Sequence, residues 1–171
     1  MEPKRDSRFS SPPTPSSRDG RLVLCAMTSI HERGFLDFAA TGARPALLGT
    51  EAEGELRDLF YSMLEVGSES FVARTEVVVH PIYGVVGYSV ESAGGHRIVS
   101  WDMLIDVDHV SFQAEASLAE RIVSRAESAG TLEIQRIARP GMHQTKLVLA
   151  GLGFSLDASG EHFRRRRTTA A

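Results

Sequence analysis

The sequence of 171 residues has one cysteine, two lysines and no long run of apolar residues. Because Cys25 is alone, it cannot form an intrachain disulfide or a cysteine-rich zinc site, and we expect a reducing, cytoplasmic compartment. The lysines are Lys4 and Lys146, so a mechanism that needs a buried lysine has one credible candidate, Lys146. No stretch approaches the roughly 18–20 apolar residues of a membrane-spanning helix, and the N-terminus lacks the apolar segment of a signal peptide. These absences predict no membrane contact and no secretion by that route.

The net charge of −3 gives no general attraction to nucleic acid or to anionic lipid. The local exception is the run Arg164–Arg167 near the C-terminus. Such a run can contact phosphate groups, but a solvated tail is the simpler interpretation. No nucleic-acid partner is therefore expected.

The composition is that of an ordinary soluble globular protein, with 42% hydrophobic and 24% charged residues. Residues 1–20 are rich in serine and proline, which predicts a disordered N-terminal tail. Residues 21–167 are long enough for one domain with its own core. Residues 168–171 are left as a short C-terminal tail.

The periodicity of apolar residues predicts a mixed set of strands and helices. Residues 42–49 are expected to form a loop, with Thr50 as the N-cap of the helix that follows. The strand–helix–strand unit at 97–137 predicts a right-handed parallel crossover. The order indicates an α/β (α+β) domain with a mixed, mostly antiparallel central sheet flanked by helices. Strands are predicted at 22–27, 71–73, 77–79, 85–90, 97–107 and 132–137, helices at 30–38, 51–65, 113–129 and 143–152, and a last hairpin at 153–163.

Two local patterns carry a resemblance to a known family. The string Leu147–Phe154 is similar to a terminal helix that ends in Leu-Gly-Phe, and Gly130 closes a helix that leads into an apolar strand. Together with the element order, these patterns resemble the GNAT superfamily of acyl-CoA-dependent N-acyltransferases over residues 21–167. The resemblance implies a GNAT-like fold, an acyl-CoA as co-substrate, and transfer of an acetyl or other acyl group to an amine.

The sequence departs from the family pattern at two places. The family's pyrophosphate loop corresponds to Val110–Glu115, which contains no glycine, although glycines let backbone N–H groups approach a diphosphate closely. The carboxylate of Glu115 would also repel that diphosphate. At the position where the family often has a tyrosine that protonates the leaving thiolate, this chain has Leu149.

The resemblance implies that the acyl-CoA arm lies along the main chain at the end of one strand, where two strands separate. The alternative is a buried central strand without a ligand. The residues implied as cofactor contacts are Leu104, Ile105, Asp106 and Val107 on the strand and Ser111, Phe112, Gln113, Ala114, Glu115 and Ala116 at the start of the next helix.

Carboxylates on the same strand are the candidates for catalysis. Strand alternation places Asp102 and Asp106 on one face, where either can accept a proton from an amine if burial raises its pKa. The alternative is a pair of solvated acids at a strand end. The spacing of Asp106, Asp108 and His109 matches no metal-binding motif, so no metal is expected. His143 opens the last helix and is a candidate for thiolate release, with helix capping or simple exposure as its alternative.

Three functions are compatible with these residues. The first is acyl transfer from acyl-CoA to an amine of a small molecule or protein, by direct attack in a ternary complex. The second is a non-catalytic GNAT-like module that binds acyl-CoA, another small ligand or a protein partner. The third is other chemistry on a small metabolite in the same site. A homodimer is left open. All the acyl-CoA interpretations need an opening between strands within residues 97–154.

Overall fold

The computed structural model describes residues 21–40, 53–65, 69–76, 78–131, 133–138 and 142–167. The tails predicted at 1–20 and 168–171, the loop at 42–49 and the cap at Thr50 lie outside these ranges.

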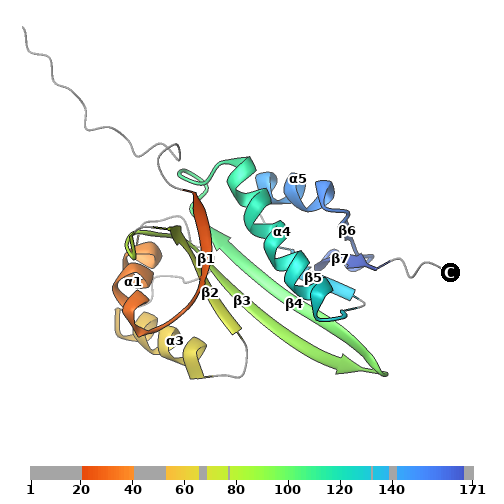
Figure 1. Cartoon of the computed structure of the whole chain (residues 1–171), viewed down its shortest axis with the longest axis horizontal. Coiled ribbons are helices and arrows are strands. Elements are labelled where there is room, and N and C mark those ends of the chain that lie inside the picture. Colours follow the sequence, from red (N-terminus) through yellow and green to blue (C-terminus); the bar gives the residue numbers. More distant parts are fainter. Residues whose placement is uncertain are drawn as a thin grey trace, which may run out of the picture.

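The core of the protein is one seven-stranded sheet with the order β1-β2-β3-β4-β5-β7-β6. Every neighbouring pair is antiparallel except β4 and β5, which are parallel. Figure 1 shows β3 and β4 as the long central strands of this sheet. The predicted mixed, mostly antiparallel sheet is thus confirmed. The strands are β1 (Leu22–Ala26), β2 (Glu69–Thr75), β3 (Ile82–Ala93), β4 (His96–Ile105), β5 (Glu133–Ile137), β6 (Ser155–Leu156) and β7 (His162–Arg166).

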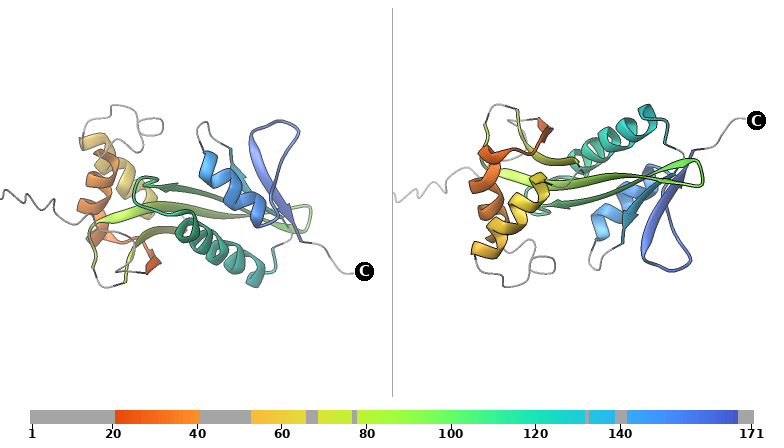
Figure 2. Two further views of the ribbon diagram at one scale, coloured as in Figure 1. Left: turned by 90° about the horizontal axis from the view of Figure 1, so that it is seen from above. Right: turned by 90° about the horizontal axis from the view of Figure 1, so that it is seen from below.

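Helices cover both faces of the sheet. The described helical segments are the 3₁₀ turn η1 (Ser29–His31), α1 (Glu32–Ala40), α3 (Glu53–Glu65), α4 (Phe112–Ser128) and α5 (His143–Gly151). Figure 2 shows α1 and α3 on the opposite side of the sheet from α4. Two apolar clusters follow this division: one joins α1 and α3 to β2 and β3, and the other joins α4 and α5 to β4, β5 and β7.

The alternation of β4 assigns its side chains to these two faces. Val99, Trp101, Met103 and Ile105 belong to the cluster beneath α4. Ser100 and Asp102 therefore point to the other face, which α1 and α3 cover farther along the strand, where Leu104 packs against their cluster.

The crossover from β4 through α4 to β5 is parallel, as the sequence predicts. The helix begins where the hydroxyl of Ser111 accepts the N–H of Ala114 at 3.2 Å, an N-cap bond. It ends before Gly130, whose φ of 73° lies in the left-handed region that glycine adopts without strain.

Two sequence predictions are wrong. Val78 and Val79, expected in a strand, lie in an irregular segment before β3 and are 45% and 39% exposed. The arginine run is not a solvated tail. Arg164 and Arg166 of β7 form ion pairs with Glu133 of β5 at 3.0 and 2.9 Å, because antiparallel pairing brings these side chains together.

Candidate functional site

Strands β4 and β5 pair over only part of their length. Their register runs from Ile98–Glu133 to Trp101–Arg136, whereas β4 continues to Ile105. We call the edge of β4 that faces β5 beyond Trp101, from Asp102 to Ile105, the fork. The strands are therefore not paired along the whole of β4, which is compatible with the opening that an acyl-CoA site needs.

The direction of the peptide groups in the fork follows from two hydrogen bonds. The carbonyl of Met103 accepts an N–H from the Arg136 side chain of β5 at 2.6 Å, so Met103 faces the fork. The N–H of Asp106 donates to the carbonyl of Tyr83 at 2.8 Å, so Asp106 faces β3. Because N–H and C=O of one strand residue share a side and successive residues alternate, the N–H groups of Met103 and Ile105 point into the fork.

This alternation changes the expected set of main-chain contacts. Leu104 faces β3, because a Cβ added to Gly84 would lie 2.8 Å from the Leu104 carbonyl oxygen. Of the strand residues predicted to bind a cofactor through their main chain, Ile105 is turned toward the fork, whereas Leu104 and Asp106 are turned away. Met103, which the sequence analysis did not single out, takes their place.

The buried side chain of Arg136 lies at the apex of the fork. It is 1% exposed, and its guanidinium lies over the Trp101 ring with 4.6 Å from Cζ to the ring centroid. Its hydrogen bond to Met103 crosses from β5 to the first fork-facing residue of β4. A permanently charged group is thus held where the two strands part.

The turn from β4 to α4 uses several of its own donors. The N–H groups of His109 and Val110 donate to the carbonyl of Asp106 at 3.1 and 2.8 Å. In the first turn of α4, Ala114 donates to the Ser111 hydroxyl. The N–H groups of Phe112 and Gln113 lack an intrahelical partner by helix geometry, and both residues are exposed. The exposed start of α4 therefore retains donors and the positive end of the helix dipole.

Glu115 does not face this exposed start. Its side chain is fully buried, accepts a hydrogen bond from the Thr145 hydroxyl, and accepts another from the Gln144 amide at 2.8 Å. Gln144 also donates to the carbonyl of Val110 at 3.2 Å. The carboxylate expected to repel a diphosphate is therefore buried between two helices, where it ties the start of α4 to the start of α5.

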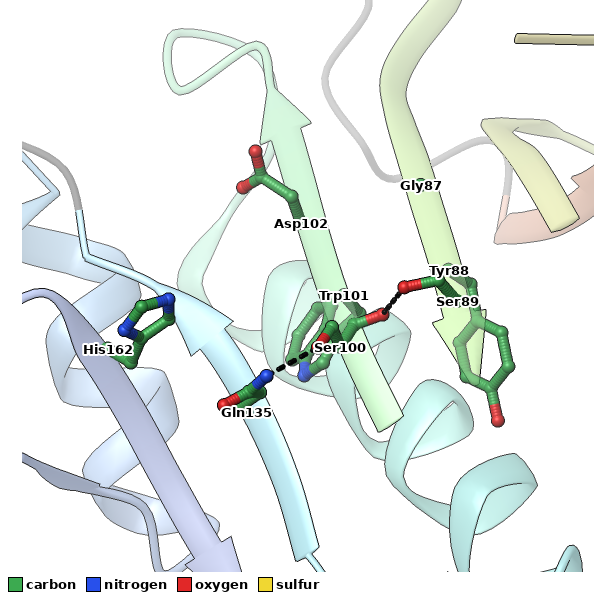
Figure 3. Close-up of a pocket in the computed structure, with 8 residues that line it drawn as sticks. All are labelled: Gly87, Tyr88, Ser89, Ser100, Trp101, Asp102, Gln135 and His162. Atoms are coloured by element: carbon green, nitrogen blue, oxygen red, sulfur yellow. Dashed lines mark hydrogen bonds between the residues drawn. The ribbon is translucent and has the colours of Figure 1, made fainter. Parts of the chain in front are cut away.

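A cavity of about 360 Å³ lies on the face of the sheet opposite α4. Figure 3 shows Asp102 of β4, Gln135 of β5 and His162 of β7 presented on one side of these three neighbouring strands. The Gln135 amide donates to the Ser100 hydroxyl at 2.6 Å, which joins β4 to β5 just before the fork. The rest of the lining comes from Gly87, Tyr88, Ser89 and Trp101.

His162 is positioned by the hairpin of β6 and β7. Asp157, at the turn, lies 3.8 Å from Nδ1 of His162 and 3.1 Å from Nε of Arg164. Hydrogen bonds from the hydroxyl of Ser159, the backbone N–H of His162 and the Arg164 side chain together lower the pKa of Asp157 to about 2. An anionic Asp157 therefore faces the imidazole at neutral pH.

The structure separates the predicted catalytic residues. Asp106 lines a different cavity from Asp102, beside α1, and its carboxylate contacts Nδ1 of His109 at 2.8 Å. His143 is exposed at the first residue of α5. Leu149 is fully buried and offers no proton donor. Asp102 is thus the predicted acid that lies in the cavity next to the fork.

Sequence reasoning missed Ser100, Gln135, Arg136 and His162. The period-two pattern that placed Asp102 on one face also places Ser100 there, so this residue could have been found. The other three need the register of β5 and β7 against β4, for which the sequence holds no local signal.

Within the described ranges, no cluster of three or more histidine, cysteine or acidic side chains is arranged to hold a metal ion. No helix in these ranges has the length and apolar character that crossing a membrane requires.

No protein-family model matches the sequence, and no match is found among curated proteins. Solved structures do match. A spermidine N-acetyltransferase SpeG chimera from Vibrio cholerae and hSSAT has a TM-score of 0.67 at 15% identity, over 85% of this chain and 95% of that one. An acetyltransferase of the GNAT family from Streptococcus pneumoniae has a TM-score of 0.60 at 10% identity, over 85% and 98%. The protein yncA from Salmonella typhimurium, assigned as an acetyltransferase and solved with its cofactor acetyl-CoA, has a TM-score of 0.62 at 12% identity, over 88% and 97%. The chain has the GNAT fold.

Proposed function

We propose that the protein transfers an acetyl or other acyl group from an acyl-CoA to a primary amine of a small molecule or protein. The observation that carries this proposal is the fork, in which the N–H groups of Met103 and Ile105 point away from β3 and toward β5. Backbone donors at such a place polarise a thioester carbonyl without a charged group. The shared fold with acetyltransferases supports the proposal.

The cofactor would lie along two parts of the chain. The thioester and its amide arm would take the donors of Met103 and Ile105, and Val107, 57% exposed beyond the strand, would border the arm. The diphosphate would take the exposed first turn of α4, through the N–H groups of Ser111, Phe112 and Gln113. Ala114, Glu115 and Ala116 would then support this turn from within the helix rather than contact the diphosphate.

The amine would enter from the cavity that Asp102 lines, on the face opposite α4. An ammonium ion is not a nucleophile, so a proton must leave before the nitrogen attacks. A carboxylate within reach of that nitrogen, directly or through one water, serves as the base. Asp102 takes this role in the proposal, and Asp106 does not, because it lines the other cavity.

A second function has its own support. The buried Leu149 and the glycine-free start of α4 favour a non-catalytic module that binds acyl-CoA without transferring the acyl group.

Two measurements on the full chain separate these functions. Acetyl-CoA is expected to raise the melting temperature in proportion to its saturation, because a ligand that binds only the folded state stabilises it. Release of free thiol from acetyl-CoA is then followed with a panel of polyamines, amino sugars, amino acids and lysine peptides. Amine-dependent thiol release supports transfer. Stabilisation without release for any amine supports the binding module, and the absence of stabilisation contradicts both.

The variant Asp102→Asn tests the base. We expect a fall in kcat of roughly 10²–10⁴-fold, the usual contribution of general base catalysis, with the affinity for acetyl-CoA kept. The matched control is Asp108→Asn, an exposed carboxylate in the turn after β4, which should leave kcat unchanged. An Asp102→Asn enzyme that is as active as the wild type would remove Asp102 from the mechanism.

A further inference from the structure

The buried arginine at the fork has no role in the mechanism above. Arg136 occupies an inward position of β5, next to Ile134 in a face that otherwise packs apolar side chains beneath α4. A guanidinium stays protonated at every pH a protein experiences, so its charge is buried together with its side chain. Burial of a charge is costly unless the surroundings stabilise it, and a charge kept at such a cost acts strongly on whatever lies beside it.

The contacts of Arg136 place its guanidinium beside the fork, on the face of the sheet that α4 covers. The Met103 carbonyl accepts a hydrogen bond from one terminal nitrogen at 2.6 Å, and the centroid of the Trp101 ring lies 4.6 Å from Cζ. Met103 and Trp101 both belong to β4. The side chain therefore spans from β5 to the strand whose N–H groups would hold the thioester.

The same region lacks the proton donor that the family resemblance leads one to expect. Leu149 fills the corresponding position of α5 and belongs to the same apolar cluster as Trp101. His143, the other candidate for thiolate release, is exposed at the start of α5. A leaving thiolate in the fork would thus have a buried cation near it in place of a hydroxyl donor.

We propose that the guanidinium of Arg136 stabilises the thiolate of CoA as it leaves, and so acts as a catalytic residue of this protein. This inference rests on the proposed function. The amine nitrogen forms a bond to the acyl carbon, the C–S bond breaks, and its electron pair stays on sulfur as a thiolate. Before the attack, Asp102 takes one proton from the ammonium ion and passes it to solvent, and it takes the second proton from the nitrogen as the amide forms. The thiolate, held by an N–H of Arg136, takes a proton from solvent after release. A charge-assisted hydrogen bond of this kind favours the thiolate over the thiol.

Other ionisable groups surround the fork, and they are the same whether CoA or its analogue without the thiol is bound. Glu115 of α4 is engaged by Thr145 and Gln144. Asp102 of β4 and His162 of β7 lie on the opposite face of the sheet. On α5, His143 and Lys146 are exposed.

The test compares the binding of CoA with that of desulfo-CoA, which lacks the thiol, by calorimetry from pH 6.5 to 9.5. Groups of the protein that titrate in this range affect both ligands alike, so the ratio of the two affinities reports the thiol alone. For the wild type we expect this ratio to rise with pH to about tenfold in favour of CoA, equivalent to a thiol pKa lowered by about one unit. Equal affinities at every pH overturn the inference. If neither CoA nor desulfo-CoA binds, it is the proposed function that fails.

Variants test whether Arg136 causes the rise of this affinity ratio with pH. Arg136→Met should bring the ratio within about twofold at every pH, whereas Arg136→Lys, which keeps a charge, should retain part of the rise. The matched control is Arg167→Met, an exposed arginine beyond β7, which should behave as the wild type. A rise that survives Arg136→Met overturns the inference. If Arg136→Met does not fold, His143→Ala decides: it should keep the full rise, and its loss would assign the effect to the histidine.

Discussion

His31 is a buried histidine in surroundings that oppose its protonation. It is 2% exposed at the end of η1, and the N–H of Thr28 donates to its Nδ1 at 3.1 Å. Burial lowers its pKa below the usual 6.5, and the positive charge of Arg74 lowers it further. The folded protein therefore keeps this imidazole neutral at a pH where the unfolded chain is protonated.

This residue predicts how stability depends on pH. Because the unfolded state binds more protons just below pH 6.5, the free energy of unfolding should fall as the pH drops through 6.5 toward the lower folded pKa. His31→Asn keeps an acceptor for Thr28 and cannot be protonated, so it should flatten this dependence in urea denaturation between pH 7.5 and 5.5. The control His96→Asn, at the exposed first residue of β4, should leave the slope as it is. A slope unchanged in His31→Asn would refute this explanation.

At the scale of elements, α4 and α5 are joined by a polar contact inside an apolar layer. Glu115 accepts hydrogen bonds from the Thr145 hydroxyl and the Gln144 amide. Gln144 also donates to the Val110 carbonyl, which extends this network to the turn before α4. The network fixes the start of α4, the proposed diphosphate site, against α5. Its members come from two helices about 30 residues apart in sequence.

Removing one donor should loosen this junction. Thr145→Val keeps the shape of the side chain and leaves a buried carboxyl oxygen without its hydrogen bond, which should cost roughly 1–3 kcal/mol of unfolding free energy. Thr145→Ser keeps the hydroxyl and should lose less than about 1 kcal/mol. Urea denaturation of the two variants measures the difference. Equal losses would show that the methyl group, and not the hydrogen bond, stabilises the junction.

At the scale of the whole molecule, regular apolar periodicity predicts the element order and the crossover at α4, because each amphipathic segment must cover one face of the sheet. The fork follows from that topology and from the short pairing of β4 with β5. The positions of Arg136 and His162 beside β4 cannot be predicted from periodicity. Their importance depends on which strand lies beside β4, and in what register, and this is decided by packing across the whole sheet.

The side-chain pattern also misleads where a strand ends. Asp102 and Asp106 share a face by alternation, but β4 ends at Ile105, and Asp106 turns toward His109 in a second cavity. Four residues of extended chain separate the two positions by about 13 Å, so the two carboxylates cannot act on one nitrogen.

The central claim is that the fork-facing N–H groups of β4 hold an acyl-CoA. Amide hydrogen exchange, followed residue by residue with and without saturating acetyl-CoA, tests this most directly. We predict that exchange slows about tenfold or more at Met103 and Ile105, while Leu104 and Asp106, already turned to β3, change little. Slowed exchange confined to other parts of the chain, or no change at Met103 and Ile105 when the ligand is bound, would contradict the account.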